Sequence, residues 1–247
     1  QELVLGVGGV RAIRALGIKP SVWHLNEGHS AFLLAERARE LVATGVPLDD
    51  ALARIRRDSV FTIHTPVSAG NERFDTGLVR RVAGALLDGD GRPNTGGVPV
   101  DRLLGIGLGA DGDTSQFDMT AFSLRLTSGA NAVSQLHART ANSTWRGVVP
   151  HEILGVTNGV HTPTWVGTPL RELLERYLDA DLDHLDPGTE AGRWWERIDR
   201  IPAAALWETH LRQKGELAHF ASRRLRAQLA RHGEPPAVLD ELDATLD

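Results

Sequence analysis

Two short apolar runs, each rich in β-forming residues and each followed by polar residues, constrain the fold of this chain most. They cover residues 21–26 and 60–64, and the stretches 30–42 and 48–57 between them have helical character. A strand, a long helical crossover and a second strand predict a parallel pair with a right-handed connection. The predicted fold class is therefore α/β, built on a parallel sheet.

Polar side chains cluster where both runs end. The first run leads into the turn-like residues Asn26, Glu27, Gly28 and His29, and the second run ends at His64. Ligands of open parallel sheets bind in the crevice beyond the carboxyl ends of the strands. We therefore expect two imidazoles, an amide and a carboxylate to face one crevice.

Apolar spacing predicts a helix over 2–16, and its glycines suggest close helix packing. These glycines are Gly6, Gly8 and Gly9. A dinucleotide-binding loop is excluded there, because Arg11 stands where a third glycine is needed. The other expected elements are helices over 77–87, 119–126, 131–145, 170–178, 190–198, 203–231 and 237–246, and a strand over 153–157.

The sequence changes character near 158–163, where we place a domain boundary. Beyond it the helices are charged and amphipathic, so one domain is expected at 1–158 and a mostly helical one at 159–247. Before it, Asp118 is expected to cap the helix that follows. The glycine-rich stretch 88–99 lacks the closing glutamate of a calcium loop, and a solvated loop is expected instead.

Composition narrows the functional classes. A net charge of −5 argues against a general nucleic-acid or anionic-membrane binder. The contents of 41% hydrophobic and 24% charged residues are ordinary for a soluble globular protein. The chain has no cysteine, which excludes disulfides, thiolate metal sites and a cysteine nucleophile. No apolar run approaches the roughly 20 residues of a membrane-spanning helix. Lys19 and Lys214 are the only lysines.

The strongest candidate residues each allow a functional and a structural interpretation. Pro66 holds Thr65 extended and stops a helix from starting, so we expect the backbone of His64 and Thr65 to lack ladder partners. A free carbonyl and an imidazole at a strand end are well placed to hold sugar hydroxyls. The alternative is a core histidine that bonds to a neighbouring carbonyl. Similarly, Asn158 and Gly159 either allow a ligand to approach the backbone or form a simple turn.

Other candidates are open in the same way. His29 either caps its own helix or lies in the crevice as a hydrogen-bond donor. Trp165, beside the expected boundary, either stacks on a flat ligand or fastens the two domains together. A metal site at His24, Glu27 and His29 is disfavoured, because its histidines are five positions apart, not four on one helical face.

Four blocks of the chain cover residues 23–32, 61–74, 118–121 and 157–165, and 131–138 fits between the last two. Together and in this order they resemble the α-glucan (glycogen or maltodextrin) phosphorylases of the bacterial branch. The resemblance implies part of a two-domain GT-B glycosyltransferase arrangement, with a Rossmann-like parallel sheet in each half. The first expected domain would then be the latter part of the N-terminal domain, and the second the helical start of the C-terminal cofactor domain.

The activity that the resemblance implies is phosphorolysis by a hexosyltransferase. Orthophosphate cleaves the terminal α-1,4-linked glucose of the glucan and releases glucose 1-phosphate. By position, His64 resembles the active-site histidine on the glucosyl unit, and Asn158 the asparagine on its 6-hydroxyl. Asn26, Glu27 and His29 resemble a cleft-lining block with a less direct role in binding substrate.

The resemblance also implies a cofactor, pyridoxal 5′-phosphate, with Trp165 near it. Neither Lys19 nor Lys214 suits the cofactor linkage, so we expect the attachment lysine and the phosphate-binding residues outside this chain. We therefore expect an internal fragment of a cytoplasmic enzyme, inactive by itself. Its parent would bind α-1,4-glucan and orthophosphate, with no nucleic acid or membrane partner, and a homo-oligomer is one option for its assembly.

The chain departs from the family pattern at two positions. Aspartate at 118 replaces an expected asparagine, and Ser68 stands in place of a frequent proline.

Two other hypotheses for the function are kept. The second hypothesis is a non-catalytic carbohydrate-binding or regulatory module of the same fold. A third hypothesis is a metal-dependent hydrolase that uses His24, Glu27, His29 and His64.

Overall fold

The computed structural model describes residues 1–67, 70–87, 97–178, 182, 196–235 and 237–238. The chain divides into two compact units, Gln1–Asn158 and Gly159–Asp247, and each has an apolar core of its own. In this described part of the chain, no helix combines the length and apolar character needed to cross a membrane. Ser68, the calcium-like stretch 88–94 and most of the helices expected over 190–198 and 237–246 lie outside the described residues.

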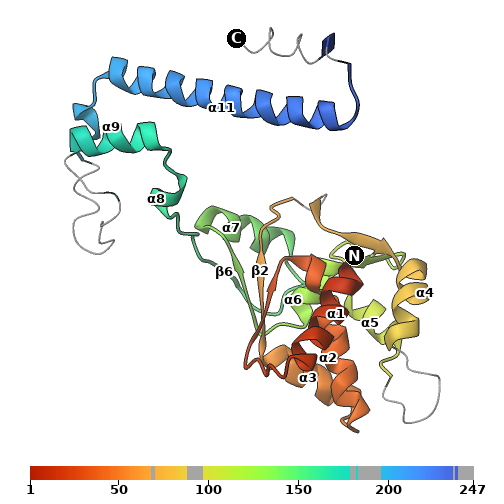
Figure 1. The fold of residues 1–247 in the computed structure, drawn as a ribbon. Coiled ribbons are helices and arrows are strands. Elements are labelled where there is room, and N and C mark those ends of the chain that lie inside the picture. The colour runs from red at the N-terminus through yellow and green to blue at the C-terminus, as the bar shows by residue number, and fades with distance from the viewer. Residues whose placement is uncertain (68–69, 88–96, 179–181, 183–195, 236, 239–247) are drawn as a thin grey trace. The chain divides into compact units, whose positions relative to one another are not determined.

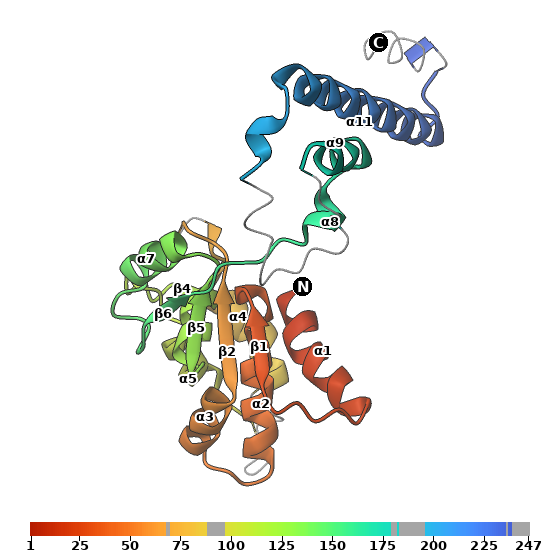
Figure 2. The same cartoon turned by 90° about the vertical axis from the view of Figure 1, so that its left-hand side faces the viewer.

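The first unit is built on a four-stranded parallel sheet (Figure 1). Figure 2 shows its strands in the order β1-β2-β5-β6. Its strands are β1 (Trp23–Asn26), β2 (Ser59–Ile63), β5 (Gly129–Ala132) and β6 (Ile153–Gly155). Asn26 pairs with Thr62, so the first two strands end at nearly the same level. The α/β class and the parallel sheet are confirmed.

Strand β5 corrects the sequence prediction, which places a helix over 131–145. That prediction is wrong at its start, because α7 (Gln135–Thr144) begins only after β5 has ended. The residues of β5 have little intrinsic preference for a strand. Their strand form depends on β2 and β6, which pair with β5 on its two sides.

A second sheet of two antiparallel strands pairs β3 (Arg73–Asp75) with β4 (Gln116–Asp118). The sequence indicates neither strand, because three-residue strands far apart in the chain leave no readable periodicity. This pairing joins the loop that follows β2 to the start of α6.

Most helices of the first unit follow the sequence prediction. They are α1 (Glu2–Ala15), α2 (Phe32–Ala43), α3 (Leu48–Arg57), α4 (Thr76–Leu87), α5 (Val100–Ile106) and α6 (Met119–Arg125), and α5 alone among them is not predicted. Side chains of β1 alternate between the two faces of the sheet, with Trp23 and Leu25 buried and His24 and Asn26 exposed. At β1, one face of the sheet therefore belongs to the core and the other carries polar groups, whereas β2 is buried along most of its length.

The second unit is helical. It contains α8 (Thr162–Trp165), α9 (Thr168–Leu178), a short 3-10 turn (Ile198–Arg200) and α11 (Ala203–Arg231). Its small core consists of Leu174, Leu178 and Leu182, with partly buried apolar residues around them. The long helix α11 contacts α9 but buries none of its own residues.

A glycine sets the distance between α1 and α2. A Cβ atom at Gly6 would lie 2.7 Å from the backbone nitrogen of Leu33, whereas nothing stands within 4 Å at Gly8 or Gly9. The predicted close packing is therefore confirmed for Gly6 and wrong for the other two glycines.

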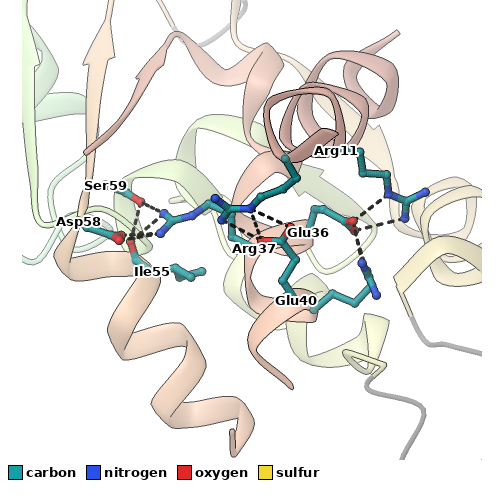
Figure 3. A network of polar contacts seen from close by, with 9 residues as sticks. Arg11, Glu36, Arg37, Glu40, Ile55, Asp58 and Ser59 are labelled. Atoms are coloured by element: carbon teal, nitrogen blue, oxygen red, sulfur yellow. Dashed lines mark hydrogen bonds and ion pairs between the residues drawn. The ribbon is translucent and has the colours of Figure 1, made fainter. Parts of the chain in front are cut away.

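A buried carboxylate also joins these two helices (Figure 3). The side chain of Glu36 on α2 is 0% exposed, and it accepts hydrogen bonds of 2.8 Å from Arg11 on α1 and from Arg39. Burial alone would raise the pKa of Glu36, but the hydrogen bonds from Arg39 and Arg11 outweigh burial and lower it.

The next residue of α2 connects the helix to the sheet. Arg37 donates to the carboxylate of Asp58 and to the hydroxyl of Ser59, both at 2.7 Å, where β2 begins (Figure 3). Its guanidinium also lies 4.7 Å from the ring centroid of Trp23, the first residue of β1. One side chain thus contacts the amino ends of both strands.

Gly6→Ala should destabilise the chain by about 1–3 kcal/mol, because α1 must move away from Leu33 to admit the methyl group. Gly9→Ala is the matched control, and it should stabilise α1 by about 0.5–1 kcal/mol, since nothing obstructs its Cβ. Urea unfolding of both variants tests this contrast. Equal effects of the two substitutions would contradict it.

Glu36 should stabilise the fold only while it is charged. Its folded pKa lies below the ordinary value of 4.5, so its contribution is complete above that value and is lost as the pH falls through the folded pKa. Urea midpoints measured from about pH 6 to about pH 3 should therefore fall more for the parent chain than for Glu36→Gln. The variant should also be less stable at the upper pH, and parallel curves would exclude this role.

Candidate functional site

The carboxyl ends of β1 and β2 bring the first candidate residues together. The Nε2 atom of His64, which directly follows β2, lies 2.5 Å from Oδ1 of Asn26 at the end of β1. Because a carbonyl oxygen only accepts, Nε2 must carry the proton of this hydrogen bond. Nδ1 of the neutral ring is then left as an acceptor, and the side chain is exposed.

The carboxylate of Glu27 holds the backbone at the same place. Its Oε2 accepts from the N–H of His64 at 2.7 Å, and from the N–H and hydroxyl of Thr65 at 3.1 and 3.2 Å. The N–H of Glu27 in turn donates to the carbonyl of Thr62 at 2.9 Å, which continues the β1–β2 ladder by one residue. Both N–H groups that follow β2 therefore bond to a side chain instead of a strand.

Glu27 has an unusual backbone conformation. Its φ of 75° and ψ of 169° fall in a region that suits glycine, and among the described residues no other non-glycine residue has a positive φ. Such a conformation costs on the order of 1–3 kcal/mol, so the surrounding contacts must hold it. The next residue, Gly28, lies close to α6, where an added Cβ would stand 3.2 Å from the Cβ of Met119.

The start of α6 adds further polar residues to this region. Asp118 is fully buried, and its two oxygens accept from the N–H of Ala121 at 2.8 Å and from Nε of Arg73 at 2.9 Å. The expected helix cap is confirmed, and the extra charge that aspartate brings is paired within the fold. The blocks 23–32, 61–74 and 118–121 are therefore neighbours in space.

Glu72 of the second block lies near the Asn26–His29 turn. Burial and the charge of Glu2 raise the pKa of Glu72, His29 acts in the opposite direction, and Glu27 adds to the increase. The carboxylates of Glu72 and Glu27 are thus close enough to repel each other. His29 itself is exposed, in the 3-10 turn Gly28–Ser30.

Two predicted residues, Asn158 and Trp165, lie outside the group formed by Asn26, Glu27, His29 and His64. Asn158 is exposed, and its N–H donates at 3.2 Å to the carbonyl of Val133, just beyond the end of β5. It therefore lies at the same carboxyl edge of the sheet as His64. Trp165 belongs to the second unit, where its side chain is 77% exposed.

The sequence analysis missed a row of polar contacts that crosses the sheet from His24 through the buried Thr62 to Asn131. Nε2 of His24 bonds to the hydroxyl of Thr62, and that hydroxyl donates to Oδ1 of Asn131, both at 2.7 Å. The available signal was a polar residue at alternate positions of otherwise apolar strands. It expected the backbone of Thr65 to lack a ladder partner, but it did not identify Glu27 as the acceptor of the N–H and hydroxyl of Thr65.

The histidines do not assemble into a metal site in the described part of the chain. No group of three or more His, Asp or Glu side chains there has a metal-binding arrangement. His24 bonds to Thr62 and His64 to Asn26, so each ring already uses Nε2 within the protein. The arrangement instead offers imidazole, amide and backbone groups beside the carboxylates of Glu27 and Glu72, a mixture of donors and acceptors that suits a ligand with several hydroxyl groups.

Comparison with known proteins gives relatives along nearly the whole chain. It is 38% identical to a maltodextrin phosphorylase of Thermococcus litoralis over 98% of this chain and 28% of the relative. It is 38% identical to a glycogen phosphorylase of Mycobacterium tuberculosis over 100% of this chain and 29% of the relative. For a glycogen phosphorylase of Aquifex aeolicus the identity is 31%, over 97% of this chain and 34% of the relative.

These relatives confirm the resemblance to the α-glucan phosphorylases. The chain spans about three tenths of the length of the curated relatives it matches. No protein-family model matches it.

Substitutions at Asp118 should separate the contributions that its two hydrogen bonds make to the free energy of unfolding. Asp118→Asn keeps an oxygen for the N–H of Ala121 and should cost about 1 kcal/mol, whereas Asp118→Ala loses both bonds and should cost about 2–3 kcal/mol. Urea unfolding measures both losses. Equal destabilisation by the two substitutions would show that the helix cap contributes nothing.

Proposed function

We propose that this chain, homologous to about three tenths of the glycogen and maltodextrin phosphorylases, is a segment of an α-glucan phosphorylase. The parent would use orthophosphate to cleave terminal α-1,4-glucosidic bonds and release glucose 1-phosphate. The observation that carries this proposal is homology over 97–100% of the chain to relatives with those names. The polar edge of the sheet around His64 agrees with it chemically.

His64 is the residue that we assign to the glucosyl unit. Cleavage of a glycosidic bond develops positive charge on the sugar ring, and dipoles fixed beforehand around that ring favour the transition state. Within the described residues, no group donates to the carbonyl oxygen of His64, which leaves it available to a sugar hydroxyl. The imidazole has Nδ1 as a second acceptor when Nε2 is bonded to Asn26.

Asn158 is proposed to complete the sugar site from the neighbouring strand ends. Its side chain is exposed and provides both a donor and an acceptor, the combination that a hydroxyl group requires. Asn26, Glu27 and His29 are proposed to line the same crevice. Trp165 is proposed to lie near the cofactor of the parent.

The cofactor implied by this function is pyridoxal 5′-phosphate, whose phosphate group supplies proton transfer to orthophosphate. Lys19 and Lys214 are both exposed, and neither fits a linkage to a cofactor in a closed site. We assign no step through the cofactor to this chain. The attachment lysine and the residues that bind phosphate are proposed to lie elsewhere in the parent.

The wider architecture is part of the same proposal. Residues 1–158 would form the latter part of the N-terminal domain of a GT-B glycosyltransferase, and 159–247 the start of its C-terminal domain. The parent would act in the cytoplasm on glucan and orthophosphate, with a homo-oligomer as one option for its assembly.

We expect the full-length polypeptide that carries this segment to release glucose 1-phosphate from maltodextrin only when orthophosphate is present. His64→Ala should lower kcat/KM by about 10²–10³-fold, because the imidazole, one of the fixed dipoles around the glucosyl ring, is lost. His219→Ala, at an exposed position of α11, is the matched control and should stay within about twofold of the parent. Equal activity in the two variants would remove His64 from the site.

The 247-residue chain alone should release no glucose 1-phosphate, because neither of its lysines suits the cofactor. Phosphate-dependent release by the chain alone would overturn that expectation.

The alternative function is a non-catalytic carbohydrate-binding module. It is favoured by the exposure of Lys19 and Lys214, because neither lysine can hold the cofactor that cleavage would need. It predicts that the full-length polypeptide binds maltodextrin without phosphate-dependent cleavage.

A further inference from the structure

We propose that Glu27 is a positioning residue for His64. This inference rests on the proposed function, because it gives a cleft-lining carboxylate a definite task within that site. Through Oε2, Glu27 fixes the turn that follows β2, and the turn carries the carbonyl and imidazole of His64.

The hydrogen bonds of Glu27 connect the ends of two strands. Its N–H bonds to the carbonyl of Thr62, and its side chain bonds to the two N–H groups that follow β2. Parallel pairing ends at this level, so without the carboxylate these N–H groups would have no partner on β1. The side chain of Glu27 thus replaces a further step of the ladder at the point where the backbone must turn.

One carboxylate oxygen receives all three donors. Oε2 accepts from His64 N–H, Thr65 N–H and Thr65 Oγ1 at 2.7, 3.1 and 3.2 Å. Oε2 is therefore taken up by the turn after β2 and has little capacity left for a sugar hydroxyl. The geometry therefore favours a role in which Glu27 acts through His64.

The backbone of Glu27 points to the same role. A φ of 75° would suit glycine, yet the residue here has a side chain that makes three hydrogen bonds. The three hydrogen bonds of its side chain explain why glutamate, and not glycine, occupies this strained position. They also provide a useful variant, because Glu27→Gly removes the carboxylate and relieves the backbone at the same time.

Asn26, the residue before Glu27, holds the imidazole ring of His64, whereas Glu27 holds its backbone. Oδ1 of Asn26 accepts from Nε2 of His64 and thereby selects one tautomer of the imidazole. This contact requires the turn after β2 to stay in place. Loss of the Glu27 carboxylate should therefore loosen the ring contact as well, although Asn26 is unchanged.

Kinetics of the full-length polypeptide test the role in catalysis. Glu27→Gly should lower kcat for phosphorolysis of maltodextrin on the order of 10²-fold, with KM little changed and without a lower thermal midpoint. Glu27→Gln keeps an oxygen acceptor and should restore most of kcat. A rise in KM with unchanged kcat in both variants would instead identify Glu27 as a substrate ligand.

A second measurement on the 247-residue chain needs no activity. Nitrogen-15 spectra of the histidine rings, with His64 assigned by its loss in His64→Gln, should show His64 protonated at Nε2 in the parent chain. Glu27→Gly should give a mixture of tautomers at His64, while His24, bonded to Thr62, stays unchanged as the internal control. An unchanged His64 signal in Glu27→Gly would overturn the positioning role.

The two measurements separate the possible failures. A tautomer change at His64 in a polypeptide without phosphorylase activity would reject the proposed function and keep the positioning role. Full activity with an undisturbed His64 in Glu27→Gly would reject the positioning role and keep the function.

Discussion

The candidate site depends on one carboxylate that joins two parallel strands beyond their last paired residues. Glu27 directly follows β1, and it accepts both backbone N–H groups that follow β2. These two N–H groups lie beyond the paired residues of the strands, so the parallel ladder does not supply their acceptor. The position of His64 is therefore determined by a side chain from a different strand.

The register of β1 and β2 has a separate support at the opposite ends of these strands. Arg37 on α2 contacts Trp23, where β1 begins, and bonds to Asp58 and Ser59, where β2 begins. The adjacent Glu36 fastens α2 to α1 through an ion pair between its buried carboxylate and the half-exposed Arg11, and a buried carboxylate without such a partner would be costly. One helix thus aligns both strands, and that alignment brings Glu27 within reach of His64.

The sequence predicted the elements whose side-chain pattern is strong and local. Helices α3 and α11 begin and end where their apolar spacing predicts, and the strands near 21–26 and 60–64 are present. It failed at β5, where glycine, alanine and asparagine form a strand only because strands pair with it on both sides. It failed also at β3 and β4, whose pairing joins residues more than 40 positions apart.

By itself, the sequence determined which chemical groups stand at the strand ends and which family the chain resembles. Those conclusions need only residue types and their order along the chain. The tertiary structure alone decided that the carboxylate of Glu27 bonds to the backbone of His64, 37 positions away, and that Glu27 adopts a positive φ. The physical reason is that hydrogen-bond partners across a parallel sheet follow from strand register and helix packing, which no local pattern records.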